Sequence, residues 1–152
     1  MDIKTSFQQT NIIYLALLGG QMFFAAIIFF VLGTNENPVD TGLGLALPFV
    51  MLGGMGAGYW IYNQRAIQGA SLSSVSEKTM HYRVSNIIRL AMTEGPNLLA
   101  LVMVLLEGQS SYWLYFAAGI LAFLYFRPSK DKFFSDYQLS ASEQQEFHAA
   151  LS

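Results

Sequence analysis

The chain contains no cysteine and little charge. The absence of cysteine excludes a disulfide framework, a thiolate metal site and a cysteine nucleophile. Only 12% of the 152 residues are charged, whereas a soluble domain carries about 25%. Hydrophobic residues make up 53% of the chain, and a chain this short has too much surface to hide them all from water. The composition therefore predicts one domain embedded in a lipid bilayer.

Residues that could hold a metal ion or perform catalysis are also scarce. His81 and His148 each lack a partner at ligand spacing, so neither a metal nor another cofactor is expected. No group of residues forms a complete catalytic constellation, and the chain is not predicted to be an enzyme. The expected surroundings are membrane lipids, with a membrane-protein partner or a homo-oligomer as the alternatives and no nucleic acid.

Four apolar stretches, at residues 11–32, 43–62, 85–106 and 112–126, predict membrane-spanning helices. A helix needs roughly 20 mostly apolar residues to cross the hydrocarbon core. Tyrosine and tryptophan, which favour the boundary between water and lipid, lie near one end of the second and fourth stretches. The first stretch is too long for a cleavable signal peptide, and no small-residue cleavage site follows it. We therefore expect an all-α fold, with a bundle of four transmembrane helices over residues 1–126.

Lysine and arginine are absent from two of the predicted loops, residues 33–42 and 107–111. Seven of the eight cationic residues lie before the first span, between the second and third, or after the fourth, and Arg89 lies inside the third. By the positive-inside rule, both termini and the loop at residues 63–84 are then cytoplasmic. Within that loop, residues 77–83 are expected to extend the third helix. We expect a multi-pass protein of the bacterial inner membrane.

Residues 127–152 are predicted to form a cytoplasmic amphipathic tail. Pro128 can begin a helix, because its missing backbone donor costs nothing in the first turn. Ser140-x-x-Glu143 predicts a capping box, followed by a last helix that ends near Leu151. Three aromatic residues of the tail predict a segment that lies at the membrane surface: Phe133, Phe134 and Tyr137. Docking of a partner on the tail is the alternative.

The chain contains a short internal repeat. Residues 11–16, Asn-Ile-Ile-Tyr-Leu-Ala, are matched 75 positions later by residues 86–91, Asn-Ile-Ile-Arg-Leu-Ala. A duplicated helical hairpin would explain the match and would give parallel repeats about an axis along the membrane normal. Chance convergence of apolar helices is the alternative. The equivalent of Gly19 in the second copy is Glu94, so this copy carries charge where the first has none.

Glu94 is the candidate functional residue, because it lies near the middle of the third predicted span. Its depth is about 13 Å by helical rise, and a charged group at helix centre costs on the order of 2.5–3.5 kcal/mol. Apolar surroundings disfavour the charged form of a carboxyl, so Glu94 could be neutral at pH 7. Arg89 does not share its helix face. We expect a partner from another helix, and the candidates are Tyr14, Gln21 and the polar ends of neighbouring spans.

Gly95 and Pro96 follow Glu94 directly. Proline removes a backbone donor and clashes with the preceding turn, so it should kink the helix and free the carbonyl group of Met92. The kink predicts a polar pocket. The candidate ion- or ligand-binding residues are Glu94, Arg89, Thr93, Asn97, Pro96, Tyr14 and Gln21. The alternative is that Glu94 only joins helices through a hydrogen bond, as polar residues do in membrane bundles.

Glycine is frequent in the second span. Gly54 and Gly58 form a small-xxx-small pair on one helix face, which lets another helix approach closely. Packing within the chain is the first interpretation, and self-association is the alternative. A helix-packing role is predicted for five glycines: Gly53, Gly54, Gly58, Gly20 and Gly95.

Residues 43–106 resemble the proteolipid (c-type) subunits of rotary ATPases. The resemblance rests on a glycine-rich helix, a polar loop, and Asn86-Ile-Ile-Arg-Leu-Ala-Met-Thr-Glu94 ahead of an apolar run. In that family the membrane carboxylate binds the transported proton or sodium ion, and the resemblance would place this role on Glu94. Arg89 and Pro96 depart from the family's pattern, as does the order of the helices.

The whole chain is similar to a family of small, uncharacterised four-helix membrane proteins from bacteria of the Bacteroidetes type. Their pattern combines Arg-x-x-x-x-Glu-Gly-Pro in the third helix with Arg-Pro-Ser-Lys just after the fourth, here residues 89–96 and 127–130. This likeness implies a four-helix fold and carries no activity with it.

Three functions follow from these observations. The first is a non-enzymatic accessory or scaffold component of a membrane assembly. The second is a proton- or ion-handling protein that uses Glu94 as its protonatable carboxyl. The third is a small-ligand or lipid-binding protein with its site at the Pro96 kink.

Overall fold

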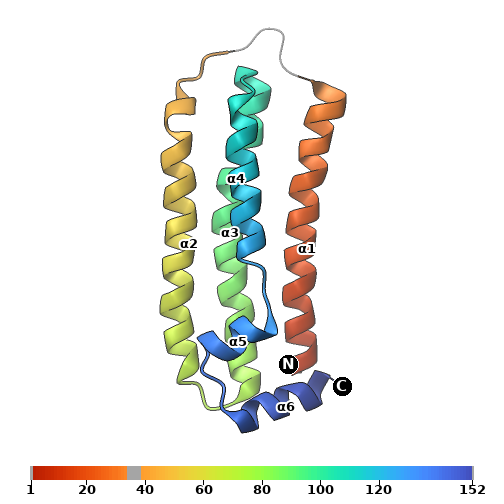
Figure 1. Ribbon diagram of the computed structural model, residues 1–152, viewed down its shortest axis with the longest axis vertical. Coiled ribbons are helices and arrows are strands. Elements are labelled where there is room, and N and C mark those ends of the chain that lie inside the picture. Colours follow the sequence, from red (N-terminus) through yellow and green to blue (C-terminus); the bar gives the residue numbers. More distant parts are fainter. Residues whose placement is uncertain (1, 34–38, 152) are drawn as a thin grey trace.

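The computed structural model describes residues 2–33 and 39–151, and every regular element in these residues is a helix (Figure 1). The predicted all-α class is confirmed. The rest of the predicted loop at 33–42, residues 34–38, lies outside the described residues. In chain order the elements are α1 (Ile3–Ile27) with its π-helical continuation η1 (Ile28–Leu32), the 3-10 turn η2 (Leu43–Leu45), α2 (Leu47–Ala70), α3 (Val75–Glu107), α4 (Ser111–Tyr125), α5 (Lys130–Asp136) and α6 (Ala141–Leu151).

Three helical segments are long and apolar enough to cross a membrane. They cover Ile3–Leu32, Leu43–Ala70 and Val75–Glu107, with 30, 28 and 33 residues. α4 is also apolar but has only 15 residues, which is about 22 Å at a rise of about 1.5 Å per residue. Large apolar side chains cover the outside of the bundle, as lipid-facing surfaces require. The most exposed, at 77–84%, are Phe30, Leu45 and Phe49.

The segment between α2 and α3 is much shorter than predicted. The sequence predicts a polar loop over residues 63–84, but both helices extend into it and leave only residues 71–74 between them. Ser74 caps α3, since its Oγ accepts a hydrogen bond from the N–H of Glu77 at 3.2 Å. A side-chain acceptor there satisfies one of the free donors at the start of a helix. The predicted extension of the third helix through residues 77–83 is confirmed.

α3 is the centre of the bundle. α2 and α1 lie on opposite sides of it, and α4 lies along it at the front of the view (Figure 1). α1 and α3 run in the same direction, and their polar side chains meet at matching levels. Asn97 Nδ2 donates to Gln21 Oε1 at 2.9 Å, and Arg83 Nη1 donates to Gln9 Oε1 at 2.6 Å. α3 therefore holds α1, α2 and α4 together.

Two of the five predicted packing glycines lie where α2 meets α3. A Cβ atom at Gly54 would lie 2.7 Å from the carbonyl oxygen of Met92, and one at Gly58 would lie 3.2 Å from Met92 Cβ. Such a close helix approach requires a small residue. Gly119 of α4, which was not predicted, faces the amide of Asn97 in the same way. The other three make no close helix contact within the described chain, because an added Cβ would meet no neighbour within 4 Å there: Gly20, Gly53 and Gly95.

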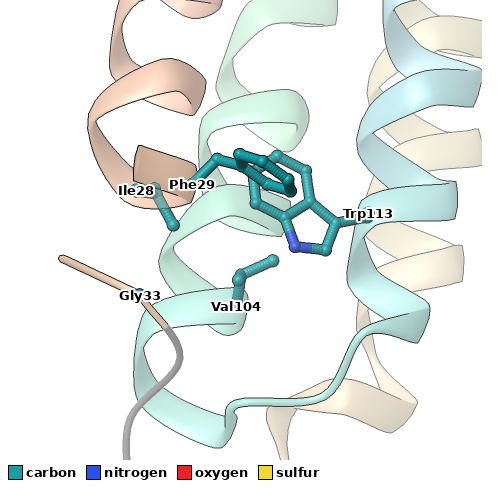
Figure 2. A pocket seen from close by; sticks show the side chains of 5 residues that line it. All are labelled: Ile28, Phe29, Gly33, Val104 and Trp113. Carbon is teal, nitrogen blue, oxygen red and sulfur yellow. The ribbon is translucent and has the colours of Figure 1, made fainter. Parts of the chain in front are cut away.

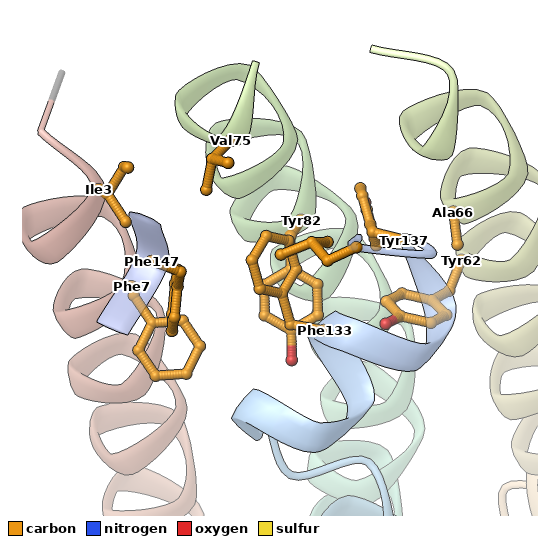
Figure 3. Packing of buried hydrophobic residues seen from close by; sticks show 10 residues of the cluster. Ile3, Phe7, Tyr62, Ala66, Val75, Tyr82, Phe133, Tyr137 and Phe147 are labelled. Carbon is orange, nitrogen blue, oxygen red and sulfur yellow. The ribbon is translucent and has the colours of Figure 1, made fainter. Parts of the chain in front are cut away.

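The C-terminal tail folds back under the bundle at the end where both termini lie (Figure 1), which we call the terminal end. Figure 3 shows buried apolar side chains from α1, α2, α3 and the tail packed together there. Phe133 and Tyr137 are 0% exposed, and their rings contact Tyr82 at centroid distances of 4.9 and 5.6 Å. These two rings are buried in the protein, and the location of the segment relative to the membrane surface stays a prediction. The tail is therefore part of the core at this end.

α6 begins as predicted. The N–H of Ser140 donates to Glu143 Oε2 at 2.7 Å, and the N–H of Glu143 donates to Ser140 Oγ at 3.4 Å. This reciprocal pair is the predicted capping box. Glu143 also forms a salt bridge of 2.7 Å with Lys78 of α3. The cap therefore also fixes α6 to the central helix.

Candidate anion-binding pocket

Arg89 is buried inside the bundle, with only 3% of its surface exposed. Its Nη2 donates to Asn86 Oδ1 at 2.7 Å and to the carbonyl oxygen of Phe126 at 3.0 Å. The guanidinium lies 3.7 Å above the centroid of the Tyr62 ring, a favourable position for a cation against an aromatic face. Gly58 brings α2 close to the backbone of α3 at this level. Three elements therefore fix the Arg89 side chain.

The charge of Arg89 is not balanced by a direct ion pair. Among the described residues no carboxylate lies within salt-bridge distance of the guanidinium, and its Nε has no hydrogen-bond partner. Removing a cation from water costs several kcal/mol unless an opposite charge and hydrogen bonds compensate. Neutral carbonyl oxygens and aromatic rings provide only part of that compensation. The site therefore favours the arrival of an anion.

A cavity of about 150 Å³ lies beside this guanidinium. It is bounded by the terminal-end part of α2, by α3, by the last residues of α4 and by α5. Phenol, amide and charged groups dominate its wall. The lining residues are Tyr59, Tyr62, Asn63, Arg89, Tyr125, Phe126, Lys132 and Asp136.

Lys132 brings a second cation to the pocket. Its Nζ donates to the carbonyl oxygen of Tyr125 and lies 4.8 Å from the centroid of that ring. Ser129 caps α5 by accepting a hydrogen bond from the Lys132 N–H at 3.2 Å. The helix therefore begins at Lys130 and not at Pro128, where the sequence allows it to begin. Burial lowers the pKa of Lys132, and the nearby Arg89 guanidinium acts in the same direction.

Asp136 is the one carboxylate in the pocket wall, and it accepts a hydrogen bond of 2.7 Å from the Tyr62 hydroxyl. Two cations against one carboxylate leave the lining with a formal charge of +1. The guanidinium, the ammonium group and the Asn63 amide are hydrogen-bond donors of the kind that recognise phosphate and carboxylate groups. The chemistry of the pocket is therefore that of anion binding.

Of the predicted site residues, only Arg89 lines this pocket. Thr93 is buried and donates to the carbonyl oxygen of Arg89 at 3.0 Å. Tyr14 stacks on Phe123 of α4 with ring centroids 5.3 Å apart. Three more serve helix packing: Asn97 bonds Gln21, as described above, and Pro96 packs on Gly54. α3 continues through Pro96 as one helix.

Glu94 is not part of a polar cluster. It is partly exposed and forms no hydrogen bond or ion pair with any described residue. On a helix it points about 140° away from Arg89. The predicted partnership of Glu94 with Tyr14 or Gln21 is wrong, because each of these side chains packs against a different neighbour.

The opposite end of the bundle has its own polar group and its own cavity. Glu107 accepts hydrogen bonds from the backbone N–H and hydroxyl of Thr41 and from the hydroxyl of Tyr112. These three donors tie the chain before η2 to the ends of α3 and α4. They also satisfy the carboxylate, so we assign it a structural role.

The cavity at that end has a volume of about 130 Å³ and lies between η1, α3 and α4. Figure 2 shows the rings of Phe29 and Trp113 meeting edge to face, and their centroids are 5.8 Å apart. Ile28, Gly33 and Val104 complete its lining. This wall is apolar apart from the indole N–H, so it suits a hydrocarbon group and not an ion.

Lys132 and Asp136 were missed as site residues. Their spacing of four on α5 puts them on one helix face, and this was the available signal. The sequence places them in a tail and gives no sign that the tail docks beside Arg89. The packing of α5 against α2 and α3 brings the three charges together.

Comparisons of the chain with protein-family models, with curated proteins and with solved structures found no match. No activity comes to this protein by similarity. What it binds has to follow from the chemistry of the pocket.

Proposed function

We propose that this protein is a non-enzymatic component of the bacterial inner membrane that binds an anionic group of the phosphate class in the pocket at Arg89 and Lys132. The proposal includes four membrane-spanning helices and a cytoplasmic location for both termini. The distribution of lysine and arginine supports this orientation, since the loops at residues 33–42 and 107–111 have neither. The pocket would then lie at the cytoplasmic boundary of the membrane.

One observation carries the proposal: Arg89 is 3% exposed, has no direct carboxylate partner in the described chain, and faces a cavity with a second cation. A phosphate oxygen could accept from both cations at once. Bonds between ionised groups are shorter and about twice as strong as neutral ones. Asp136 limits the excess to one positive charge, and this suits a singly charged ligand.

A test compares thermal unfolding in a neutral detergent with and without added anion. Inorganic phosphate and phosphatidylglycerol are the two probes, and Lys132→Gln is the variant. Lys130→Gln is the matched control, because Lys130 is exposed, lies on the same helix and is not in the pocket wall. At least one probe should raise the unfolding temperature of the native protein and the control, but not that of Lys132→Gln, because binding to the folded state stabilises it. Equal stabilisation of all three proteins contradicts the proposal.

The duplicated hairpin stays part of the proposal. The parallel course of α1 and α3 supports it, as does the Gln21–Asn97 bond, which joins residues 76 positions apart at one level. The two proposed copies do not pack alike. α4 lies against α3, whereas α2 lies on the far side of α3 from α1 (Figure 1).

A further inference from the structure

We infer that the anion at Arg89 and Lys132 is the headgroup of a phospholipid, and that one acyl chain of this lipid lies in the groove between α2 and α4. The inference rests on the proposed function. It adds the source of the anion and the path of the chain attached to it.

A second cavity on the same side of the bundle provides the place for the chain. It has a volume of about 230 Å³ and lies between α2 and α4. Its wall is hydrocarbon and ring carbon: Pro48, Met51, Leu52, Met55, Tyr115 and Ala118. Methionine is unbranched and adapts its shape to irregular partners. Such a wall can bind a flexible chain but offers nothing to an ion.

The two cavities follow one another along the same pair of helices. From Tyr62 to Met55 the rise of α2 is about 10 Å, and from Phe126 to Ala118 the rise of α4 is about 12 Å. One leaflet of the hydrocarbon core is about 15 Å deep. The apolar cavity therefore begins at a depth that an acyl chain reaches when its headgroup sits in the charged pocket.

The packing of the helices leaves this groove open. α2 and α4 both pack along α3 and make little contact with each other. Tyr59 and Phe126 are the exception: they stack with centroids 6.4 Å apart, where the groove meets the charged pocket. Aromatic rings favour this boundary between headgroups and hydrocarbon. The order along the groove is thus charge, aromatic ring and hydrocarbon, which is also the order of groups along a phospholipid.

The test separates the chain from the headgroup. Purified protein in a neutral detergent is titrated with phosphatidylglycerol, or with glycerol phosphate as a headgroup without a chain, and bound ligand is measured by native mass spectrometry. Ala118→Phe fills the groove, and Ala117→Phe adds the same ring to the wall of a separate apolar cavity between α1 and α4. Both alanines are exposed, so neither change disturbs the core. Lys132→Gln tests the charged pocket.

Phosphatidylglycerol should bind the native protein and Ala117→Phe with the same affinity. Ala118→Phe and Lys132→Gln should each lower this affinity by roughly tenfold. Equal binding to Ala118→Phe and Ala117→Phe, with a loss in Lys132→Gln, would overturn the acyl groove and leave the proposed function intact. Glycerol phosphate binding as tightly as the lipid would also overturn it, because the source would be a free phosphate. If Lys132→Gln bound phosphatidylglycerol and glycerol phosphate as tightly as the native protein does, both the acyl groove and the proposed function would be contradicted.

Discussion

The surroundings of the Lys132 ammonium group favour its neutral form. Burial and the Arg89 guanidinium lower its pKa, and Asp136 acts in the opposite direction. An anion in the pocket needs this lysine protonated. Binding should therefore weaken as the pH rises through the lowered pKa of Lys132.

We expect the native protein to lose affinity for phosphatidylglycerol as the pH rises, over a range that lies below the ordinary lysine pKa of about 10.4. Lys132→Arg should keep its affinity over this range, because arginine does not lose its proton in proteins. Titrations in a neutral detergent at several pH values measure both. Parallel curves for the two proteins would mean that Lys132 does not set the pH dependence.

Glu143 has two tasks, since it completes the capping box of α6 and pairs with the buried Lys78. Lys78 and the donors at Ser140 hold the pKa of Glu143 below its usual range. A carboxyl with a lowered pKa stabilises the fold above its unfolded pKa, and this contribution is lost as the pH falls through the folded pKa.

Glu143→Gln keeps a capping side chain, because glutamine also serves in the capping box, but it removes the ion pair. It should lower the free energy of unfolding by about 1 kcal/mol at pH 7. The difference should shrink as the pH falls below the ordinary glutamate pKa of about 4.3 and vanish below the lowered pKa of the folded state. Thermal unfolding in detergent measures this, with the exposed Glu146→Gln as the control. A difference that does not change with pH would show that the charge of Glu143 is not what stabilises the tail.

Between elements, the tightest fit is that of α2 on α3. The methyl group of Gly54→Ala would lie 2.7 Å from both the Met92 carbonyl oxygen and Pro96 Cγ. Neither neighbour can move freely, because one is backbone and the other is a proline ring. We expect a loss of about 1–3 kcal/mol, as in other overpacked cores.

Gly53→Ala is the matched control, since its methyl group would meet no neighbour within 4 Å. Alanine is also the better helix former, so this variant should be as stable as the native protein or slightly more so. Unfolding in detergent at matched lipid content gives both values. Equal losses in the two variants would mean that helix propensity, and not the α2–α3 contact, controls stability here.

The helices were predictable from the sequence, whereas their ends were not. Apolar runs of about 20 residues mark spans reliably, but polar turns that continue a helix beyond the membrane look like loops. For this reason residues 63–84 read as a loop although most of them are helical. Ser140 and Glu143 were predictable because a capping box is a local signal. Arg89 could be singled out as a charge inside a span, but the docking of Lys132 and Asp136 beside it depends on distant packing.

The orientation of the whole molecule can be tested directly, because the chain has no cysteine of its own. Ser71 lies in the short segment between α2 and α3, and Gln109 lies between α3 and α4; both are exposed. With cytoplasmic termini, a membrane-impermeant maleimide should label Gln109→Cys in intact spheroplasts and Ser71→Cys only after lysis. The opposite result would place the termini and the charged pocket outside the cell.

The central place of α3 has a consequence for biosynthesis. α1 and α2 leave the ribosome first, yet they lie on opposite sides of α3 and have their main partner in it. Until α3 arrives, Gln21 lacks the amide of Asn97, and the glycine face of α2 is open to lipid. Synthesis of the 33 residues of α3 takes roughly 2 to 7 s at ordinary elongation rates. During that interval the nascent chain holds two hydrophobic helices whose main partner in the fold has not yet been made.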